Sequence, residues 1–259
     1  MLEPISISIC ISLALQFGLW IVSVRKNNAG WVDFGWSSGM ALSGVVLLLT
    51  VPLTVRSVLV SVLFIGWAVR LASHVLFDRL LKGKPEDDRY RNLREHWGDH
   101  ANLHFMWFFL GQALLVGLFM LPALTVATRQ GPAPDVLDIL GLLLALLAIG
   151  GESLSDRQLA KFRADHSTKG KVCTRGFWRY SRHPNYFFEW LHWWGYVIMG
   201  LGSPLWFLTL VGPVFMYIFL RYVTGVPHAE RQSLSSRGDA YRDYQKTTPV
   251  FFPWKPQTH

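Results

Sequence analysis

A basic and aromatic segment at residues 170–189 has the composition of an anion-binding site. Its cations and interleaved rings are Lys171, Arg175, Phe177, Trp178, Arg179, Tyr180 and Arg182. The residue before a proline avoids the helical region and proline suits the first helical turn, so we expect a loop up to His183 and a helix from Pro184. The free N–H groups and partial positive charge of a helix start, ringed by arginines, favour an anion with several oxygens. Phosphate fits this description best.

A basic loop that only meets anionic lipid headgroups is the simpler interpretation of this segment. Two features weigh against it. The cations alternate with rings, unlike a plain lysine run. In addition, Asn185, Tyr186 and Glu189 place polar groups on the first turns of an apolar helix. Polar groups at membrane depth are costly unless they bind something, so these residues are candidates for binding.

The composition indicates a membrane protein. Of 259 residues, 51% are hydrophobic and only 16% are charged, which excludes a typical soluble domain. The formal charge of +8 lies in short segments between apolar runs, which favours a cytoplasmic membrane face and predicts no nucleic-acid partner. Cys10 lies in an apolar run and Cys173 in a basic loop, so we expect no disulfide and no cysteine-built metal site.

Seven apolar runs are long enough to span a bilayer, which needs roughly 20 residues. They cover residues 5–24, 32–51, 55–81, 104–126, 136–160, 186–201 and 205–223. The first lacks the features of a cleaved signal peptide. With the N-terminus outside, 22 of the 25 Lys and Arg fall on the inner side, and only Arg56 and Arg129 on the outer side. We therefore predict an all-α, polytopic, monomeric protein of one domain, residues 1–259, with seven transmembrane helices and a cytoplasmic C-terminus.

Ionisable residues also occur inside the predicted spans. Arg70, His74 and Asp78 recur every four residues, on one helical face of the third span, and Asp33 begins the second. An interhelical ion pair or hydrogen bond would explain them structurally. Ionisable groups at this depth are nevertheless candidate functional groups, and several from different spans suggest a shared cavity. The histidines at 96, 100 and 104 have no cysteine beside them, so no metal site is expected.

The sequence resembles a known family over nearly its whole length. The matching residues are Asp156, Gln158, Leu159, Phe162, Arg163, Gly170, the run from Gly176 to Tyr186, and Glu189. They are similar to the C-terminal domain of steroid 5-alpha-reductases and their bacterial relatives. The stretches 28–36 and 86–90 resemble the bacterial branch. Sterol reductases of the C14 and delta-7 type and isoprenylcysteine methyltransferases share a run similar to residues 182–186.

The resemblance implies a seven-helix reductase of the bacterial inner membrane or the endoplasmic reticulum. NADPH would lie in a cytoplasm-facing pocket within residues 150–259, and a lipid-like enone would enter from the bilayer. Positions matching cofactor contacts are Asp156, Arg163, Lys171, Arg179, Asn185 and Arg221. Further residues of the same segment that we expect at the cofactor are Arg175, Tyr180, Arg182, His183 and Glu189. Glu152 replaces an asparagine of the animal enzymes.

The animal enzymes hold the steroid ketone with a glutamate and a tyrosine, where this chain offers Asp33, Arg70 and His74. Enone reduction needs a hydride, which NADPH supplies, and a hydrogen-bond donor for the enolate oxygen. Burial in an apolar pocket would keep Asp33 protonated and able to donate. His74 or Arg70 could share this role, and Tyr186 is a further candidate proton donor.

Two alternatives stay open at this point. One is a membrane methyltransferase of the isoprenylcysteine or phospholipid type, which would use S-adenosylmethionine. That cofactor has no phosphate, whereas the many cations suit a dinucleotide with a 2′-phosphate. The other is a lipid or sterol binder without catalysis.

Overall fold

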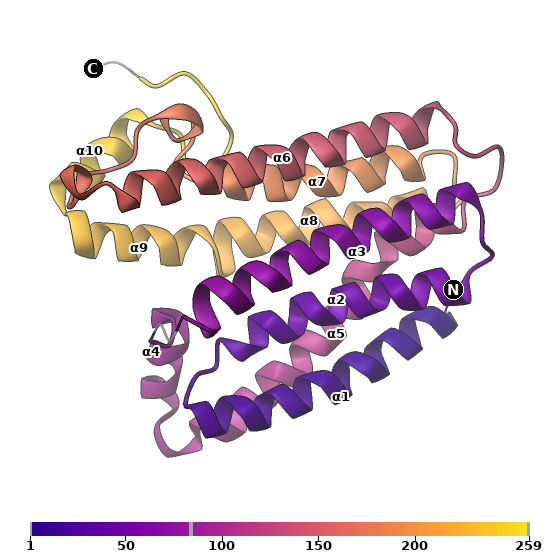
Figure 1. Cartoon of the computed structure of the whole chain (residues 1–259), viewed down its shortest axis with the longest axis horizontal. Coiled ribbons are helices and arrows are strands. Elements are labelled where there is room, and N and C mark those ends of the chain that lie inside the picture. Colours follow the sequence, from indigo (N-terminus) through magenta and orange to yellow (C-terminus); the bar gives the residue numbers. More distant parts are fainter. Residues whose placement is uncertain (1, 83–84, 258–259) are drawn as a thin grey trace. The chain divides into compact units, whose positions relative to one another are not determined.

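The computed structural model describes residues 2–82 and 85–257, and in these residues the chain forms helices and no β-strand (Figure 1). The α-helices are α1 (Leu2–Lys26), α2 (Trp31–Thr50), α3 (Val55–Val75), α4 (Asp88–Trp97), α5 (Ala101–Ala127), α6 (Val136–Ala164), α7 (Pro184–Gly200), α8 (Val211–Ile218), α9 (Val226–Arg237) and α10 (Asp239–Thr247). Single π-helical turns, η1 (Leu76–Leu80) and η6 (Phe219–Val223), extend α3 and α8. Short 3-10 turns complete the chain: η2 (Gly98–His100), η3 (His166–Thr168), η4 (Gly176–Arg179) and η5 (Trp206–Leu210).

Six helical stretches of the described residues are long and apolar enough to cross a membrane. They are Leu2–Lys26, Trp31–Thr50, Val55–Leu80, Asp88–Ala127, Val136–Ala164 and Trp206–Arg237. The remaining predicted span corresponds to α7, which has 17 residues. Its length of about 25 Å is less than the roughly 30 Å of a hydrocarbon core. The all-helical prediction is confirmed, while the count of seven spans and their orientation stay predictions.

Local sequence explains where helices begin. At the start of α3, Thr54 and Ser57 form a capping box: the Ser57 N–H donates to Thr54 Oγ1 (3.1 Å), and the Thr54 N–H donates to Ser57 Oγ (2.8 Å). The expected helix after His183 does begin at Pro184. The charged loop before α4 includes Gly83 and Lys84, which lie outside the described residues.

The chain forms two compact units, and the first comprises Met1–Asp138 and Gly200–Val211. Within it, α1 buries a polar face and exposes an apolar one. Ser8, Ser12 and Gln16 are at most 1% exposed, whereas Ile11 and Phe17 lie on the surface. Small and polar residues at helix contacts, with apolar residues facing outward, are typical of helix packing in lipid.

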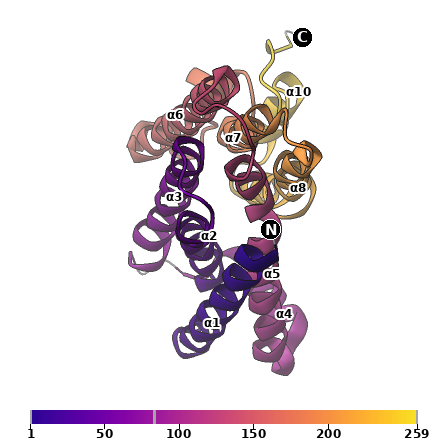
Figure 2. The ribbon, with the colours of Figure 1, turned by 90° about the vertical axis from the view of Figure 1, so that its right-hand side faces the viewer.

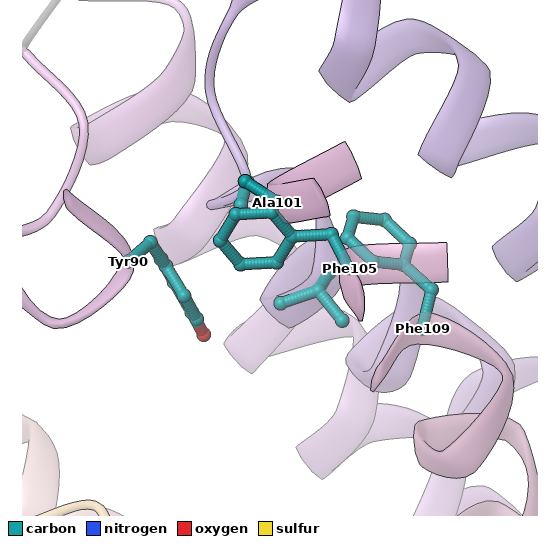
Figure 3. Packing of buried hydrophobic residues seen from close by; sticks show 6 residues of the cluster. Tyr90, Ala101, Phe105 and Phe109 are labelled. Carbon is teal, nitrogen blue, oxygen red and sulfur yellow. The ribbon is translucent and has the colours of Figure 1, made fainter. Parts of the chain in front are cut away.

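An aromatic cluster holds α4 in the first unit. Tyr90 packs with Ala101, Phe105 and Phe109 of α5, and all four residues are at most 5% exposed (Figure 3). The rings of Tyr90 and Phe105 meet edge to face, with centroids 6.3 Å apart. The same cluster includes Val32 at the start of α2. It therefore packs α4 against α2 and α5.

A buried ionic network closes the turn between α5 and α6. Asp138 is fully buried and accepts from Arg56 Nε (2.9 Å) and Arg129 Nη2 (2.9 Å). Arg129 Nη2 also lies 2.8 Å from Asp135 Oδ2. The Arg56 guanidinium further donates to the carbonyl oxygens of Arg129 (2.8 Å) and Pro132. Arg56 and Arg129, the two cations expected on the outer side, therefore neutralise Asp135 and Asp138. Arg56 also donates hydrogen bonds to main-chain carbonyl oxygens of the turn.

The second unit comprises Ile139–Met199 and Gly212–His259. In it, α7 lies between α6 and α8 (Figure 2). The close approach of α6 and α7 requires glycine, because a Cβ on Gly141 would lie 2.5 Å from the carbonyl oxygen of Gly195. A Cβ on Gly195 would in turn lie 2.7 Å from the carbonyl oxygen of Gly141. Such pairs let membrane helices pack at short distance.

Candidate functional site

The loop between α6 and α7 is anchored on α6 by two aromatic residues. Gly176 has φ +59°, a conformation that favours glycine, and a Cβ there would meet Gln158. The Phe177 N–H donates to Gln158 Oε1 (3.0 Å), and Trp178 Nε1 donates to the carbonyl oxygen of Ser155 (3.0 Å). One ring of the alternating pattern therefore has a structural role, because Trp178 is buried and bonded to α6.

The C-terminal residues hold the same loop from another side. We call residues 248–254 the C-terminal strap. Ser181 Oγ donates to the carbonyl oxygen of Phe251 (2.8 Å), and the Trp254 N–H donates to that of Tyr180 (2.9 Å). From α10, the Tyr244 hydroxyl donates to the carbonyl oxygens of Trp178 and Ser181. Burial raises the pKa of Tyr244 above its ordinary range, so this hydroxyl stays a donor.

Arg182 and His183 are bound to Glu230 of α9. Arg182 Nε donates to Glu230 Oε1 (2.6 Å), and His183 Nε2 lies 3.3 Å from the same oxygen. Arg182 Nη1 also donates to the carbonyl oxygens of Gln245 (3.0 Å) and Thr248 (2.7 Å). Burial lowers the pKa of His183, and the Glu230 carboxylate offsets this only in part. Both residues were predicted at the cofactor. In the structure, the side chains of Arg182 and His183 bind the start of α7 to α9, and Arg182 also binds it to α10 and the strap.

The other cations of the segment have different surroundings. Arg163, Lys171, Arg175 and Arg179 are all exposed. In the described ranges, 2–82 and 85–257, none of these four side chains forms an ion pair. Arg237 of α9 joins them, because its Nε donates to the carbonyl oxygen of Lys171 (3.1 Å). Sequence reasoning missed Arg237, since it is 66 positions away and belongs to no local motif.

Asn185 presents an unsatisfied acceptor at the start of α7. Its Nδ2 donates to Asp156 Oδ1 (3.1 Å), so α7 and α6 meet through this amide. Its Oδ1 is buried, and no donor from the described part of the chain reaches it. Buried polar atoms are normally hydrogen-bonded, so an orphaned amide oxygen indicates a position that a ligand donor can fill. Sequence reasoning had placed both Asp156 and Asn185 at the cofactor.

The remaining predicted residues of this unit lie on several different elements. Tyr186 stacks on His183 with ring centroids 5.3 Å apart and planes 5° from parallel. Glu189 on α7 and Glu152 on α6 are buried carboxyl groups, 7% and 8% exposed. Arg221, in the π-helical turn η6, lies over the Tyr222 ring, 5.0 Å from its centroid. Tyr180 is exposed, and its carbonyl oxygen accepts a hydrogen bond from the Trp254 N–H of the strap.

Asp33, in the first unit, is an acceptor of hydrogen bonds. The Tyr90 hydroxyl donates to its Oδ1 (2.7 Å), and Arg89 Nη2 donates to its Oδ2 (3.2 Å). Arg79 Nη1 lies 3.7 Å from the same Oδ2. The carboxyl group of Asp33 thus has three polar partners, one hydroxyl and two guanidinium groups. Polar partners therefore surround Asp33, where we expected an apolar pocket.

The same network includes Asp87, which lies before α4. Burial raises the pKa of its carboxyl, but the charge and hydrogen bonds of Arg89 outweigh burial and the net pKa is lowered. Asp87 and Asp33 thus share Arg89 and Arg79. Sequence reasoning missed Tyr90 as the partner of Asp33, although the motif at residues 86–90 already contained it.

On the predicted polar face of α3 and η1, the side chains of His74 and Asp78 contact each other at the surface. His74 Nδ1 lies 3.1 Å from Asp78 Oδ2, one helical turn along the same stretch, and the two side chains are 48% and 44% exposed. Lys82 donates to the same Asp78. Arg70 lies one turn before His74. His74 therefore contacts Asp78 of the same helical stretch, and a cavity shared by His74, Arg70 and Asp33 stays a prediction.

Comparison with known proteins places the chain in one family. The family described as protein of unknown function (DUF1295) matches residues 19–248, which include the Asp33 network, the loop before α7 and all of α10. No curated protein and no solved structure matches the chain. Because the match extends over far more than half of the sequence, the chain belongs to the DUF1295 family.

Proposed function

We propose that this protein is a membrane-embedded, NADPH-dependent reductase that transfers a hydride to the C4–C5 double bond of a 3-oxo-4-ene steroid or a similar lipid enone. The observation that supports it most is the group of exposed cations at the loop before α7 that have no ion pair in the described residues: Arg163, Lys171, Arg175 and Arg179. Uncompensated guanidinium groups are the usual ligands of phosphate oxygens. The likeness to steroid 5-alpha-reductases supplies the reaction class.

The residues at this loop fit NADPH in number and kind. The cofactor carries a pyrophosphate and a 2′-phosphate, and the four cations with Arg237 could neutralise both. The orphaned Oδ1 of Asn185 would accept from an amide or amine of the cofactor, with Asp156 holding the Asn185 side chain. NADPH supplies the hydride when bound. Arg182 and His183 position the loop in this proposal and do not contact the phosphates.

The substrate is proposed to be lipophilic because apolar helices make up most of the chain. Since Asp33 is an acceptor held by Arg89 and Tyr90, we propose Tyr186 as the proton donor to the enolate oxygen. Tyr186 stands one residue from Asn185 at the start of α7, and its ring is fixed by stacking on His183. Asp33 would then support the fold of the first unit.

The topology that goes with this function has the N-terminus outside and the C-terminus in the cytoplasm, with α7 as the sixth of seven spans. The split of 22 inner against 2 outer cations supports it. In a bacterium the membrane would be the inner membrane. Reporter fusions after Gln257 and after Gln130 should then report opposite compartments, and the same compartment for both would contradict this topology.

Calorimetry with NADPH, NADH and S-adenosylmethionine on the purified protein tests the cofactor. We expect NADPH to bind most tightly and NADH more weakly, because only NADPH presents the 2′-phosphate. Binding of S-adenosylmethionine alone would overturn the reductase proposal in favour of the methyltransferase. A reductase assay with a 3-oxo-4-ene steroid then tests the reaction, with Tyr186→Phe as the variant that should retain NADPH binding and lose turnover.

A further inference from the structure

The backbone of the C-terminal strap is fixed along the loop before α7. The Arg182 N–H donates to the carbonyl oxygen of Pro249 (2.9 Å), which adds to the bonds that Phe251 and Trp254 form with Ser181 and Tyr180. The Phe251 side chain is 1% exposed, whereas the side chain of the next residue, Phe252, is 49% exposed. The strap is therefore an ordered segment with one buried and one exposed side.

The exposed side of the strap belongs to an aromatic patch. We define this patch as Tyr180, Tyr222, Phe252 and Trp254, which are 42%, 60%, 49% and 75% exposed. Two of its rings share one neighbour: the Tyr217 ring lies 5.9 Å from Phe252 and 5.9 Å from Tyr222. Clustered exposed rings mark an interaction surface, and Tyr and Trp are enriched where membranes meet water.

The patch lies where apolar helix gives way to polar loop. The Phe252 ring packs on Trp190, in the second turn of α7, with centroids 5.4 Å apart. Two residues later, Trp254 is bound to the main chain of the polar loop at Tyr180. The strap thus runs from the apolar part of α7 to the loop that carries the cations. This is the depth at which interfacial rings of membrane proteins are found.

The charges around the patch are positive. Tyr180, Pro253, Trp254 and Lys255 line a shallow hollow of about 430 Å³. Neither Lys255 nor the nearby Arg179 forms an ion pair in the described residues. The acids of α10 are neutralised locally, since Asp239 pairs with Arg242 and Asp243 with Lys246. Rings with adjacent unpaired cations complement a surface of anionic headgroups.

We propose that the C-terminal strap is an interfacial anchor that docks on a bilayer containing anionic phospholipid. Phe252 and Trp254 insert at the headgroup level, and Lys255 binds the lipid phosphate. Because the strap also binds the main chain of Tyr180 and Arg182 and the hydroxyl of Ser181, docking fixes the loop before α7 at the membrane surface. This inference requires no reductase activity and stands whether or not NADPH is the cofactor.

A spin label at residue 254 measures the insertion. The label is attached to Trp254→Cys of the full chain, in a Cys10→Ser, Cys173→Ala background, reconstituted in bilayers with phosphatidylglycerol. The matched control is Arg242→Cys on α10, where the native side chain is 67% exposed. We expect the label at 254 to be shielded from a water-soluble nickel reagent and accessible to oxygen, and the label at 242 to show the reverse. Equal nickel accessibility at both positions would overturn the proposal.

Lipid selectivity is tested with the same label. One cation near an anionic surface is worth about a fivefold change in an equilibrium. Lys255→Gln should therefore lower the ratio of inserted to free label about fivefold in phosphatidylglycerol, and leave it unchanged in phosphatidylcholine alone. Lys246→Gln, which removes a cation paired with Asp243, should change little. An equal effect of the two variants, or no dependence on lipid charge, would contradict a role for Lys255.

A double variant tests whether the exposed rings, and not the backbone of the strap, provide the anchor. Phe252→Ser with Trp254→Ser removes the exposed rings and keeps the backbone bonds of the strap, including the Trp254 N–H. We expect this double variant to stay monodisperse, and a label placed at 255 in it to become accessible to nickel. A well-folded double variant whose label remains shielded would show that the rings do not anchor the strap.

Discussion

The arginines at the turn between α5 and α6 and those of the loop before α7 have opposite surroundings. Arg56 is 2% exposed, touches Asp138 and Asp135, and donates to carbonyl oxygens of the turn. Arg175 and Arg179 are exposed, and the described residues supply no ion pair for either. A compensated cation stabilises the fold, whereas an uncompensated one is available to a ligand. The two groups should therefore respond to substitution in opposite ways.

The largest effect is expected for Arg56→Met. This substitution leaves the fully buried Asp138 with one cation fewer and removes donors from the turn. Breaking a buried ion pair costs about 3–5 kcal/mol, so the unfolding temperature in detergent should fall strongly. Arg242→Met, at an exposed pair, is the control and should change stability by less than about 1 kcal/mol. Similar unfolding temperatures for the two variants would remove the structural role of Arg56.

Next in size is the loss of NADPH affinity in Arg179→Gln. A hydrogen bond to a charged group contributes about 1.5–3 kcal/mol, so the Kd should rise about 10- to 100-fold without a change in unfolding temperature. Arg182→Gln, three positions on, should instead lower the unfolding temperature, because Arg182 binds Glu230 and the carbonyl oxygens of Gln245 and Thr248. If both variants lost only affinity, our division of the segment into ligands and scaffold would be wrong.

A smaller effect is expected from Tyr90→Phe. It keeps the ring in the aromatic cluster and removes only the hydroxyl that donates to Asp33. Loss of one hydrogen bond to a charged acceptor should lower stability by about 1.5–3 kcal/mol, partly offset because Arg89 and Arg79 remain beside the carboxylate. Thermal unfolding measures this. The variant should keep its turnover and a normal Kd for NADPH. Complete loss of turnover in a folded Tyr90→Phe variant would show that the Asp33 network takes part in the mechanism.

The smallest expected effect is the loss of stability in acid, which should arise at the turn between α5 and α6 and not at the loop before α7. The Arg129 hydrogen bonds lower the pKa of Asp135 from its ordinary 3.8 to about 2. A lowered pKa stabilises the folded state above the ordinary value, and this contribution is lost as the pH falls from about 4 toward 2. Unfolding temperatures measured over this range should fall, and Asp135→Asn should remove part of the slope. The loop arginines keep their charge throughout.

Several features of this protein follow from the sequence alone. Apolar runs of membrane length predict helices, because in lipid each backbone group must be bonded within its own segment. The His183–Pro184 boundary is likewise local, since proline restricts its predecessor and suits a helix start. The position of the cation-rich loop between two helices needed no tertiary information.

Only the tertiary structure decided which charges are compensated. Arg179 and Arg182 have the same chemistry and stand three positions apart, yet Arg182 alone meets Glu230, 48 residues further on. Asp33 accepts a hydrogen bond from Tyr90, which is 57 positions away in the chain. Arg56 is neutralised by Asp138 across 82 positions. Composition and spacing describe neighbours along the chain, whereas the charge balance of a side chain depends on partners that folding brings from distant segments.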